Sequence, residues 1–296
     1  MNVCPIPLEP ESVRLVLIEA ADAAGRDAFQ AVAAAALAVD GYEPFNEQTM
    51  FDVRAGKRAA YSISAGRVVG AAVAGAGEVD LVVTPTARRR GYGRSALTTM
   101  LETVDGAVTA WSHGDHPGAR ALATRLGFEA VRTLLELRMP LEPRQRHPLP
   151  AKFVIDTFRP DADADDSVAL NAHVFAAHPE QGGVTLADLT DRQSEHWFSA
   201  QDFLVARDPD GRMVGYNWLK VEGDVGEIYV LGVHPDTAGA GLGRALMLAG
   251  LDHLSARGCT TASLYVEADS VGPVHLYRSL GFTDHTVDVQ YRRPPV

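Results

Sequence analysis

Two glycine-rich turns, one in each half of the chain, contain the residues best suited to binding a ligand. In each, an apolar run reaches a proline, alternate glycines follow and an amphipathic helical pattern begins. The residues are Pro85, Gly91 and Gly93 in VDLVVTPTARRRGYGRSAL, and Pro235, Gly241 and Gly243 in VLGVHPDTAGAGLGRALML. A helix N-terminus presents unpaired N–H groups, and glycine lets an anion approach the backbone closely. Both turns therefore predict a phosphate or pyrophosphate site.

The residues around the turns limit which classes of phosphate-bearing ligand could bind there. Neither turn supplies the third glycine of a dinucleotide fingerprint, and a Walker A lysine is absent. Arg88, Arg89 and Arg90 precede the first turn and would add charge-assisted contacts to a phosphate. The second turn has Ala238 and no such arginines, so its backbone N–H groups would carry the binding, helped by Arg244.

A second shared segment shows that the turns belong to a repeat. Residues 117–128 read PGARALATRLGF and residues 272–282 read GPVHLYRSLGF. Both patterns predict a short helix that ends at a left-handed glycine, Gly127 or Gly281. Around them, each half runs through a helix, short strands, the glycine turn, a helix, a strand, the short helix and a last strand. Such long-range self-similarity indicates duplication.

This order predicts an α/β (α+β) fold with two tandem domains, each a mixed central β-sheet flanked by helices. The Pro-rich, basic stretch PLEPRQRHPLP has no periodicity and predicts a linker. The expected boundaries are 1–141 for the N-terminal domain, 142–151 for the linker and 152–296 for the C-terminal domain.

Composition limits the partners. The net charge of −11 argues against nucleic acid and fits either a small cationic substrate, such as an amine, or solubility alone. No apolar run is long enough to span a bilayer, and the N-terminus lacks a basic signal-peptide region. Cys4 and Cys259 have no pairing pattern, which favours the reducing cytoplasm. His113, His116 and His178 lack metal-ligand spacing, so no metal site is expected.

The turns RRRGYG and AGAGLG resemble the Q/R-x-x-G-x-G/A pyrophosphate loop of the GNAT N-acetyltransferases. The short helices resemble that superfamily's later helix, which precedes its last strand. The resemblance covers both halves and implies an acyltransferase with acetyl-CoA as cosubstrate. The cofactor contacts that it implies in the second half are Leu231, Gly232, Val233, Ala238, Gly239, Ala240, Gly241, Leu242, Gly243, Arg244, Ser270, Val271, Gly272, Pro273, Val274 and His275. In the first half they are Leu81, Val82, Val83, Arg89, Arg90, Gly91, Tyr92, Gly93 and Arg94.

Acetylation of an amine needs a base for the ammonium proton and a donor to the departing thiolate. In the family the base is often a glutamate on the strand before the loop, and the acid is often a tyrosine on the later helix. Glu227 and Tyr277 match these positions.

The first half is expected to lack this pair. Aligning the two prolines puts Gly77 opposite Glu227 and turns Glu78 to the other strand face. Aligning the two helix-ending glycines puts Ala123 opposite Tyr277. The first half is therefore predicted to be non-catalytic, though still able to bind acetyl-CoA.

Further runs resemble a two-domain branch of the superfamily that acetylates the cysteinyl amine of Cys-GlcN-Ins, the last step of mycothiol biosynthesis. They are AVDGYEPFNEQ, WSHGDHPGAR, AAHPEQGGVT, GYNWLKVE, GEIYVLGVHP and LYVEAD. The substrate contacts that this resemblance implies are Glu47, Glu180, Lys220, Glu227 and Tyr265. Two alternatives stay open: acetylation of another small amine or a peptide N-terminus, and a non-catalytic acyl-CoA-binding sensor. A monomer whose partners are small molecules is expected.

Overall fold

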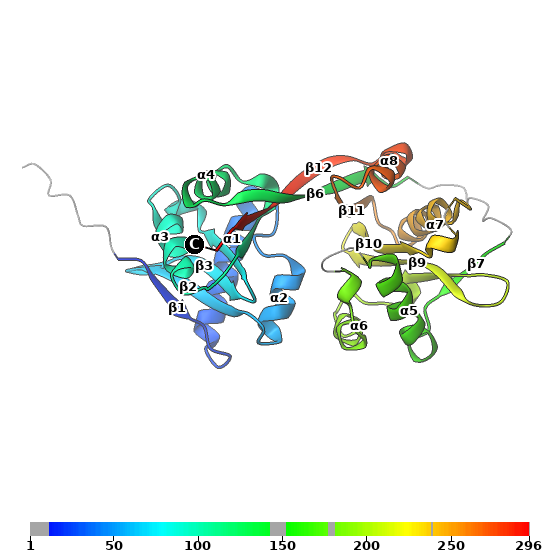
Figure 1. Cartoon of the computed structure of the whole chain (residues 1–296), viewed down its shortest axis with the longest axis horizontal. Helices are drawn as coiled ribbons and strands as arrows, with labels where there is room; N and C mark the ends of the chain where they lie inside the picture. The colour runs from blue at the N-terminus through cyan, green and yellow to red at the C-terminus, as the bar shows by residue number, and fades with distance from the viewer. Residues whose placement is uncertain (1–11, 143–151, 177–180, 238, 296) are drawn as a thin grey trace, which may run out of the picture. The chain divides into compact units, whose positions relative to one another are not determined.

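The chain folds into two compact units, and neither is a continuous stretch of sequence. The computed structural model describes residues 12–142, 152–176, 181–237 and 239–295. The first unit comprises the described residues up to Leu134 together with those from Thr286 onward, and the second runs from Leu135 to His285. Figure 1 labels the helices and strands and colours them by position in the chain. The predicted linker lies almost entirely outside the described residues.

The first unit is built on a mixed sheet. In chain order its elements are β1 (Arg14–Leu17), α1 (Ala23–Asp40), α2 (Glu47–Arg54), β2 (Ala59–Ala65), β3 (Arg67–Gly75), β4 (Glu78–Val83), α3 (Tyr92–Leu101), β5 (Val108–Ser112), α4 (Pro117–Leu126), and parts of β6 (Glu129–Pro140) and β12 (Thr283–Arg293). Strands β1 to β4 pair antiparallel in sequence order, and β4 pairs parallel with β5. A parallel pair needs a crossover, which α3 supplies.

Successive side chains along a strand point to opposite faces of the sheet, and here the two faces pack against different helices. Ala71, Val73 and Val82 lie in one core with the apolar side of α1. Their neighbours Ala72 and Val79 lie in the other core with α3. Helices α1 and α3 therefore cover opposite faces.

The second unit repeats this plan. Its elements are β7 (Val154–Thr157), α5 (Pro160–Val174), α6 (Leu186–Gln193), β8 (Phe203–Arg207), β9 (Met213–Glu222), β10 (Val225–Val233), α7 (Leu242–Ala256), β11 (Thr261–Glu267), α8 (Val271–Leu280), and parts of β6 and β12. Strands β7 to β10 pair antiparallel and β10 pairs parallel with β11. The fold class predicted from the sequence is confirmed.

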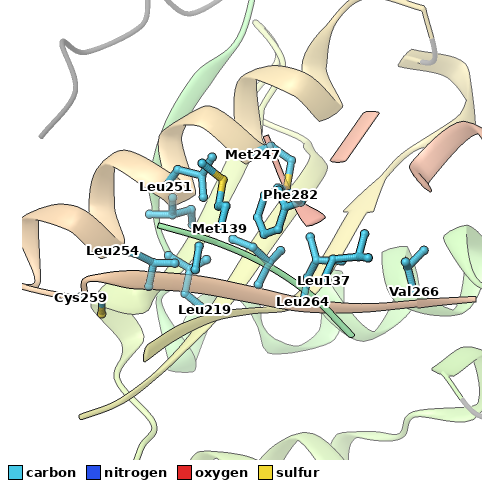
Figure 2. Close-up of a cluster of buried hydrophobic side chains, with 13 residues drawn as sticks. Leu137, Met139, Leu219, Met247, Leu251, Leu254, Cys259, Leu264, Val266 and Phe282 are labelled. Carbon is cyan, nitrogen blue, oxygen red and sulfur yellow. The ribbon is translucent and has the colours of Figure 1, made fainter. Parts of the chain in front are cut away.

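The main core of the second unit lies between its sheet and α7. Figure 2 shows Met247, Leu251 and Leu254 of α7 beside Leu219 and Leu264 of the sheet. All of them are at most 1% exposed. Completely burying a side chain of this size stabilises a fold by about 1.5–3 kcal/mol, so this layer holds the strands of the second unit firmly.

The units exchange strand ends along the sequence. Val289–Arg293, at the end of the chain, pair antiparallel with β5 of the first unit. Leu137 and Met139, from the first half of the sequence, are buried in the core of the second unit. Each unit therefore needs a segment from the other half of the sequence.

Local signals read from the sequence are visible in the backbone. Helices α4 and α8 end at Gly127 and Gly281, both left-handed, with φ of 74° and 106°. This confirms the predicted helix ends. Among the described residues, no helix is long and apolar enough to cross a membrane. Within the same residues, no cluster of three or more His, Cys, Asp or Glu is placed to hold a metal ion.

Candidate active site

The second glycine turn leads directly into α7. Gly239 and Gly241 are left-handed, with φ of 79° and 80°, and Gly241 begins the helix without a side-chain cap. The α7 N-terminus therefore keeps its positive end free of a capping side chain. Arg244 Nη1 donates to Ser279 Oγ over 3.2 Å, which links the start of α7 to α8. Ala238 lies outside the described residues.

Strands β10 and β11 separate beside this turn. Their parallel ladder runs from Val225 only as far as Ile228, whereas β10 continues to Val233 in its antiparallel ladder with β9. A β-bulge between Ile228 and Val230 makes Tyr229 an extra residue in β10. The edge of Leu231–Val233 that faces away from β9 is therefore outside the β10–β11 ladder, where its backbone N–H groups can meet a ligand.

Glu227 stands just before the bulge, in the middle of three strands. Its register partners are Lys220 on β9 and Ser263 on β11. Tyr265, two residues beyond Ser263, shares their face and is 47% exposed. The neighbour Ile228 points the other way, into the core under α7. The structure therefore brings together the predicted residues Lys220, Glu227 and Tyr265.

Tyr277 lies on the opposite side of the sheet from Glu227. It packs on the core beneath α7, with its ring centroid 6.1 Å from that of Phe282. Burial raises the pKa of the Tyr277 hydroxyl to about 12, so this hydroxyl stays protonated at neutral pH. A ligand between the ends of β10 and β11 would have Glu227 on one side and Tyr277 on the other.

Two further residues, Glu47 and Glu180, are predicted to contact the substrate. Glu47 is the first residue of α2 in the first unit, directly after the N-cap Asn46. Glu180 is outside the described residues.

The first unit contains a cavity of about 710 Å³ at the matching place. It opens where β4 and β5, joined in register at Glu78 and Thr109, separate. The predicted cofactor residues that line it are Leu81, Val82, Val83, Arg89, Gly91, Tyr92, Gly93 and Arg94. Arg90 is not among the residues lining the cavity. Ala123, which corresponds to Tyr277, lines it with a methyl group.

Arg88 also lines this cavity, and its predicted phosphate contact stays a prediction. Its guanidinium donates two hydrogen bonds to the carboxylate of Asp40, over 2.7 and 2.6 Å, and a third to the carbonyl oxygen of Val83. The hydrogen bonds that Arg88 donates to the Asp40 carboxylate raise the pKa of Arg88. Arg88 therefore fastens the glycine turn to α1 and β4.

The expectation that Glu78 faces away from the position of Glu227 is wrong. Strand β4 pairs with β3 without a register shift, whereas β10 carries the extra Tyr229. Counted back from Val83 and Val233 along the ladders, Glu78 and Glu227 reach the same position. Tyr229 cannot be recognised as an extra residue by counting along the sequence.

Glu78 nevertheless has different surroundings from Glu227. Arg58, whose side chain is 1% exposed, places Nη1 3.0 Å from Glu78 Oε2 and Nη2 2.6 Å from Asp80 Oδ2. A buried arginine shared by two carboxylates fixes both of them in one arrangement. Glu78 is thus part of a structural ion-pair network.

Sequence reasoning missed the aromatic residues beside Lys220. Trp197, in the segment after α6, lies 5.1 Å from the Lys220 ammonium and 5.0 Å from the ring of Tyr229. Arg192 Nε donates to the hydroxyl of Tyr229 over 3.1 Å. These residues come from three separate segments of the chain and belong to no repeated motif.

In both units, a glycine turn leads into a helix beside two parallel strands that separate. This combination defines a tandem acetyltransferase of the GNAT type. The model of the acetyltransferase (GNAT) family matches residues 36–128 and 172–282. Among solved structures, the chain is similar to a tandem GNAT protein from the clavulanic acid biosynthesis pathway, with a TM-score of 0.74 and 19% identity over 95% of this chain and 98% of that one. It is also similar to a GCN5-related N-acetyltransferase from Sphaerobacter thermophilus, with a TM-score of 0.71 and 22% identity over 97% and 98% of the two chains. At these identities the likeness shows the fold.

Sequence relatives specify the family further. A mycothiol acetyltransferase from Clavibacter michiganensis subsp. michiganensis is 47% identical over 98% of this chain and 97% of its own length. One from Salinispora arenicola is 41% identical over 96% and 98% of the two chains. The chain belongs to the acetyltransferase (GNAT) family and, within it, to the mycothiol acetyltransferases. Enzymes of this class use acetyl-CoA as cosubstrate.

Proposed function

We propose that the second unit transfers the acetyl group of acetyl-CoA to the cysteinyl amine of Cys-GlcN-Ins, the last step of mycothiol biosynthesis. The observation that carries this proposal is the row of Lys220, Glu227 and Ser263 across three strands, at the place where β10 and β11 separate. The row sets a carboxylate beside a gap between strands, with a helix N-terminus at the far end of the same strand.

Acetyl-CoA would bind along the end of β10. Its pyrophosphate would lie on the N–H groups of the turn at Gly239–Gly243, where the partial positive charge of α7 favours an anion. Its pantetheine amides and thioester carbonyl would accept hydrogen bonds from the backbone of Leu231–Val233. The residues Ser270–His275, at the start of α8, would complete this side of the site.

Glu227 would act as the base, directly or through a water molecule. It takes a proton from the acceptor ammonium, and the free amine attacks the thioester carbonyl carbon. The new C–N bond forms, the tetrahedral oxyanion collapses and the C–S bond breaks. The second proton on the attacking nitrogen passes to the departing sulfur, so the products are the neutral amide and the CoA thiol. Lys220, Tyr265, Glu47 and Glu180 are proposed to hold the hydroxyls and ammonium of the acceptor.

Tyr277 would donate a hydrogen bond to the departing sulfur. With a pKa of about 12, its hydroxyl is a weaker acid than a thiol, whose usual pKa is about 8.5. Complete proton transfer from Tyr277 to the thiolate is therefore unfavourable. A hydrogen bond that strengthens as charge develops on sulfur fits this pKa better.

The first unit would bind acetyl-CoA without turning it over. Its cavity between β4 and β5 has the matching position, and Arg89 and Arg94 line it. Ala123 offers no hydroxyl, and Glu78 is held by Arg58. A second role for this unit is proposed through Glu47, as a contributor to acceptor binding.

Incubation with acetyl-CoA and Cys-GlcN-Ins tests the function. We expect N-acetylated product by mass spectrometry in a one-to-one ratio with CoA measured by chromatography. A panel with L-cysteine, glucosamine and a peptide N-terminus compares the other acceptors. Faster turnover of a panel member would replace the acceptor, and acetyl-CoA binding without any acetylation would indicate a sensor.

A further inference from the structure

Trp197 forms an aromatic platform beside the proposed base. Its side chain is only 6% exposed, and its ring lies 5.0 Å from the ring of Tyr229 and 5.9 Å from that of Trp218. Trp218 is on β9 and Tyr229 is the bulge residue of β10. Packing on two strands at the bulge fixes the orientation of the Trp197 ring.

The Lys220 ammonium lies on this platform. Its Nζ is 5.1 Å from the centroid of the Trp197 ring, within the range of a cation–π interaction, and 3.1 Å from Glu222 Oε2. The Lys220 side chain is only 14% exposed. A ring on one side and a carboxylate on another therefore restrain a side chain that is otherwise flexible.

The indole nitrogen indicates which part of Trp197 is used. Among the described residues, the buried Trp197 Nε1 has no hydrogen-bond partner. A buried N–H without a partner costs free energy, so the ring is not held there by its polar atom. The specific contacts of Trp197 are made by its ring, with Tyr229, Trp218 and the Lys220 ammonium.

We infer that Trp197 is a positioning residue for the acceptor site: its ring holds the Lys220 ammonium beside Glu227, where it donates hydrogen bonds to the hydroxyls of a polyol-bearing amine. This inference rests on the proposed function. Trp197 acts through Lys220 and need not touch the acceptor. A restrained lysine loses less rotamer entropy when the acceptor binds, so the effect is on acceptor affinity.

Steady-state kinetics of Trp197→Leu and Trp197→Phe test the inference in the full chain. We expect Trp197→Leu to raise the KM for Cys-GlcN-Ins by about 5- to 30-fold, with the KM for acetyl-CoA within about twofold. Trp197→Phe, which keeps a smaller aromatic face and loses the pyrrole part of the indole with its unpaired N–H, should recover much of the affinity. Phe198→Leu is the matched control, because Phe198 meets the edge of Trp218 rather than Lys220.

A double-mutant cycle with Lys220→Met separates positioning from a general packing defect. If Trp197 acts through Lys220, adding Trp197→Leu to Lys220→Met changes the acceptor KM no further. Additive losses, equal effects on both KM values, or a Phe198→Leu defect as large as that of Trp197→Leu would overturn the inference. Absence of Cys-GlcN-Ins acetylation in the wild type would instead refute the proposed function, so the two failures are distinguishable.

Discussion

Two glutamates at the same ladder position differ in what surrounds them. Glu227 lies between Lys220 and Ser263 at the mouth of a strand gap, whereas Glu78 is bound by the buried Arg58. A base must gain and lose a proton during each turnover. A carboxylate held by a buried arginine is poorly placed for this role, because taking up a proton would break the ion pair.

Substitution of these two glutamates tests the assignment of the base. Glu227→Gln keeps the shape but cannot accept a proton, so we expect kcat to fall by about 10²–10⁴-fold. Glu78→Gln should leave kcat within about twofold, because the second unit is the proposed active one. A larger loss of kcat in Glu78→Gln than in Glu227→Gln would reverse the roles of the units.

The pKa of Tyr277 predicts a pH-independent effect. Burial keeps this hydroxyl protonated up to a pKa of about 12, so Tyr277→Phe should lower kcat by a constant factor, about 10²-fold, between pH 7 and 9. The half-buried core residue Tyr61 provides the control Tyr61→Phe. A loss in Tyr277→Phe that changed steeply across this pH range would show that Tyr277 ionises during the reaction.

At the scale of elements, the left-handed glycines of the second turn are directly testable. Gly241 has φ of 80°, and a Cβ there would meet no atom within 4 Å, so Gly241→Ala adds backbone strain of about 1–2 kcal/mol without a clash. The strain should displace the phosphate-binding N–H groups and raise the KM for acetyl-CoA. Gly211 has φ of 83° and equally open surroundings in an exposed hairpin. Gly211→Ala should cost similar stability without changing the KM for acetyl-CoA. If Gly241→Ala and Gly211→Ala had the same KM for acetyl-CoA, the result would count against the turn as the cofactor site.

Asp163 joins α5 to β8 and predicts how stability depends on pH. Burial alone raises the pKa of this carboxyl, but hydrogen bonds from Arg159 and Arg207 outweigh it and lower the pKa from 3.8 to about 2. A lowered folded-state pKa means stability that is present above pH 4 and lost as the pH falls toward 2.

Asp163→Asn should therefore reduce the free energy of unfolding by about 2 kcal/mol at pH 7, and by progressively less below pH 4. Urea unfolding at several pH values measures this difference. The exposed neighbour on the same helix supplies the control Asp165→Asn, which should have little effect at any pH. A difference that grew as the pH fell would contradict the sign of this prediction.

Across the molecule, the exchanged strand ends make the folding of each unit depend on both halves of the sequence. Val289–Arg293 pair with β5, and Asp288 accepts a hydrogen bond from the Gly114 backbone in the same unit. A chain that ends at His285 would lack these partners of the first unit. We expect hydrogen exchange in β5 to accelerate strongly, since one edge of the strand loses its ladder. Removal of only the last three residues, Pro294 to Val296, is the control, and unchanged protection of β5 after the longer truncation would show that the exchanged end is dispensable.

Several features followed from the sequence because they depend on short segments. The glycine turns, the helix-ending Gly127 and Gly281, and the order of elements are local signals, so the tandem fold could be predicted. The positions of Glu227 and Tyr277 followed from matched motifs. The equivalence of Glu78 and Glu227 could not be found in this way, since it depends on a bulge that exists only in the pairing of β9 with β10.

That the chain is a duplicated acetyltransferase could be inferred from its residues alone, because turns and helix ends are encoded by residues close together in the chain. The ion pairs of Arg88 with Asp40 and of Arg58 with Glu78, and the contact of Trp197 with Lys220, became visible only in the folded chain. These pairings join residues on different elements, and their energies depend on burial and distance. The exchanged strand ends have the same origin, because strand pairing is decided between segments far apart in the chain.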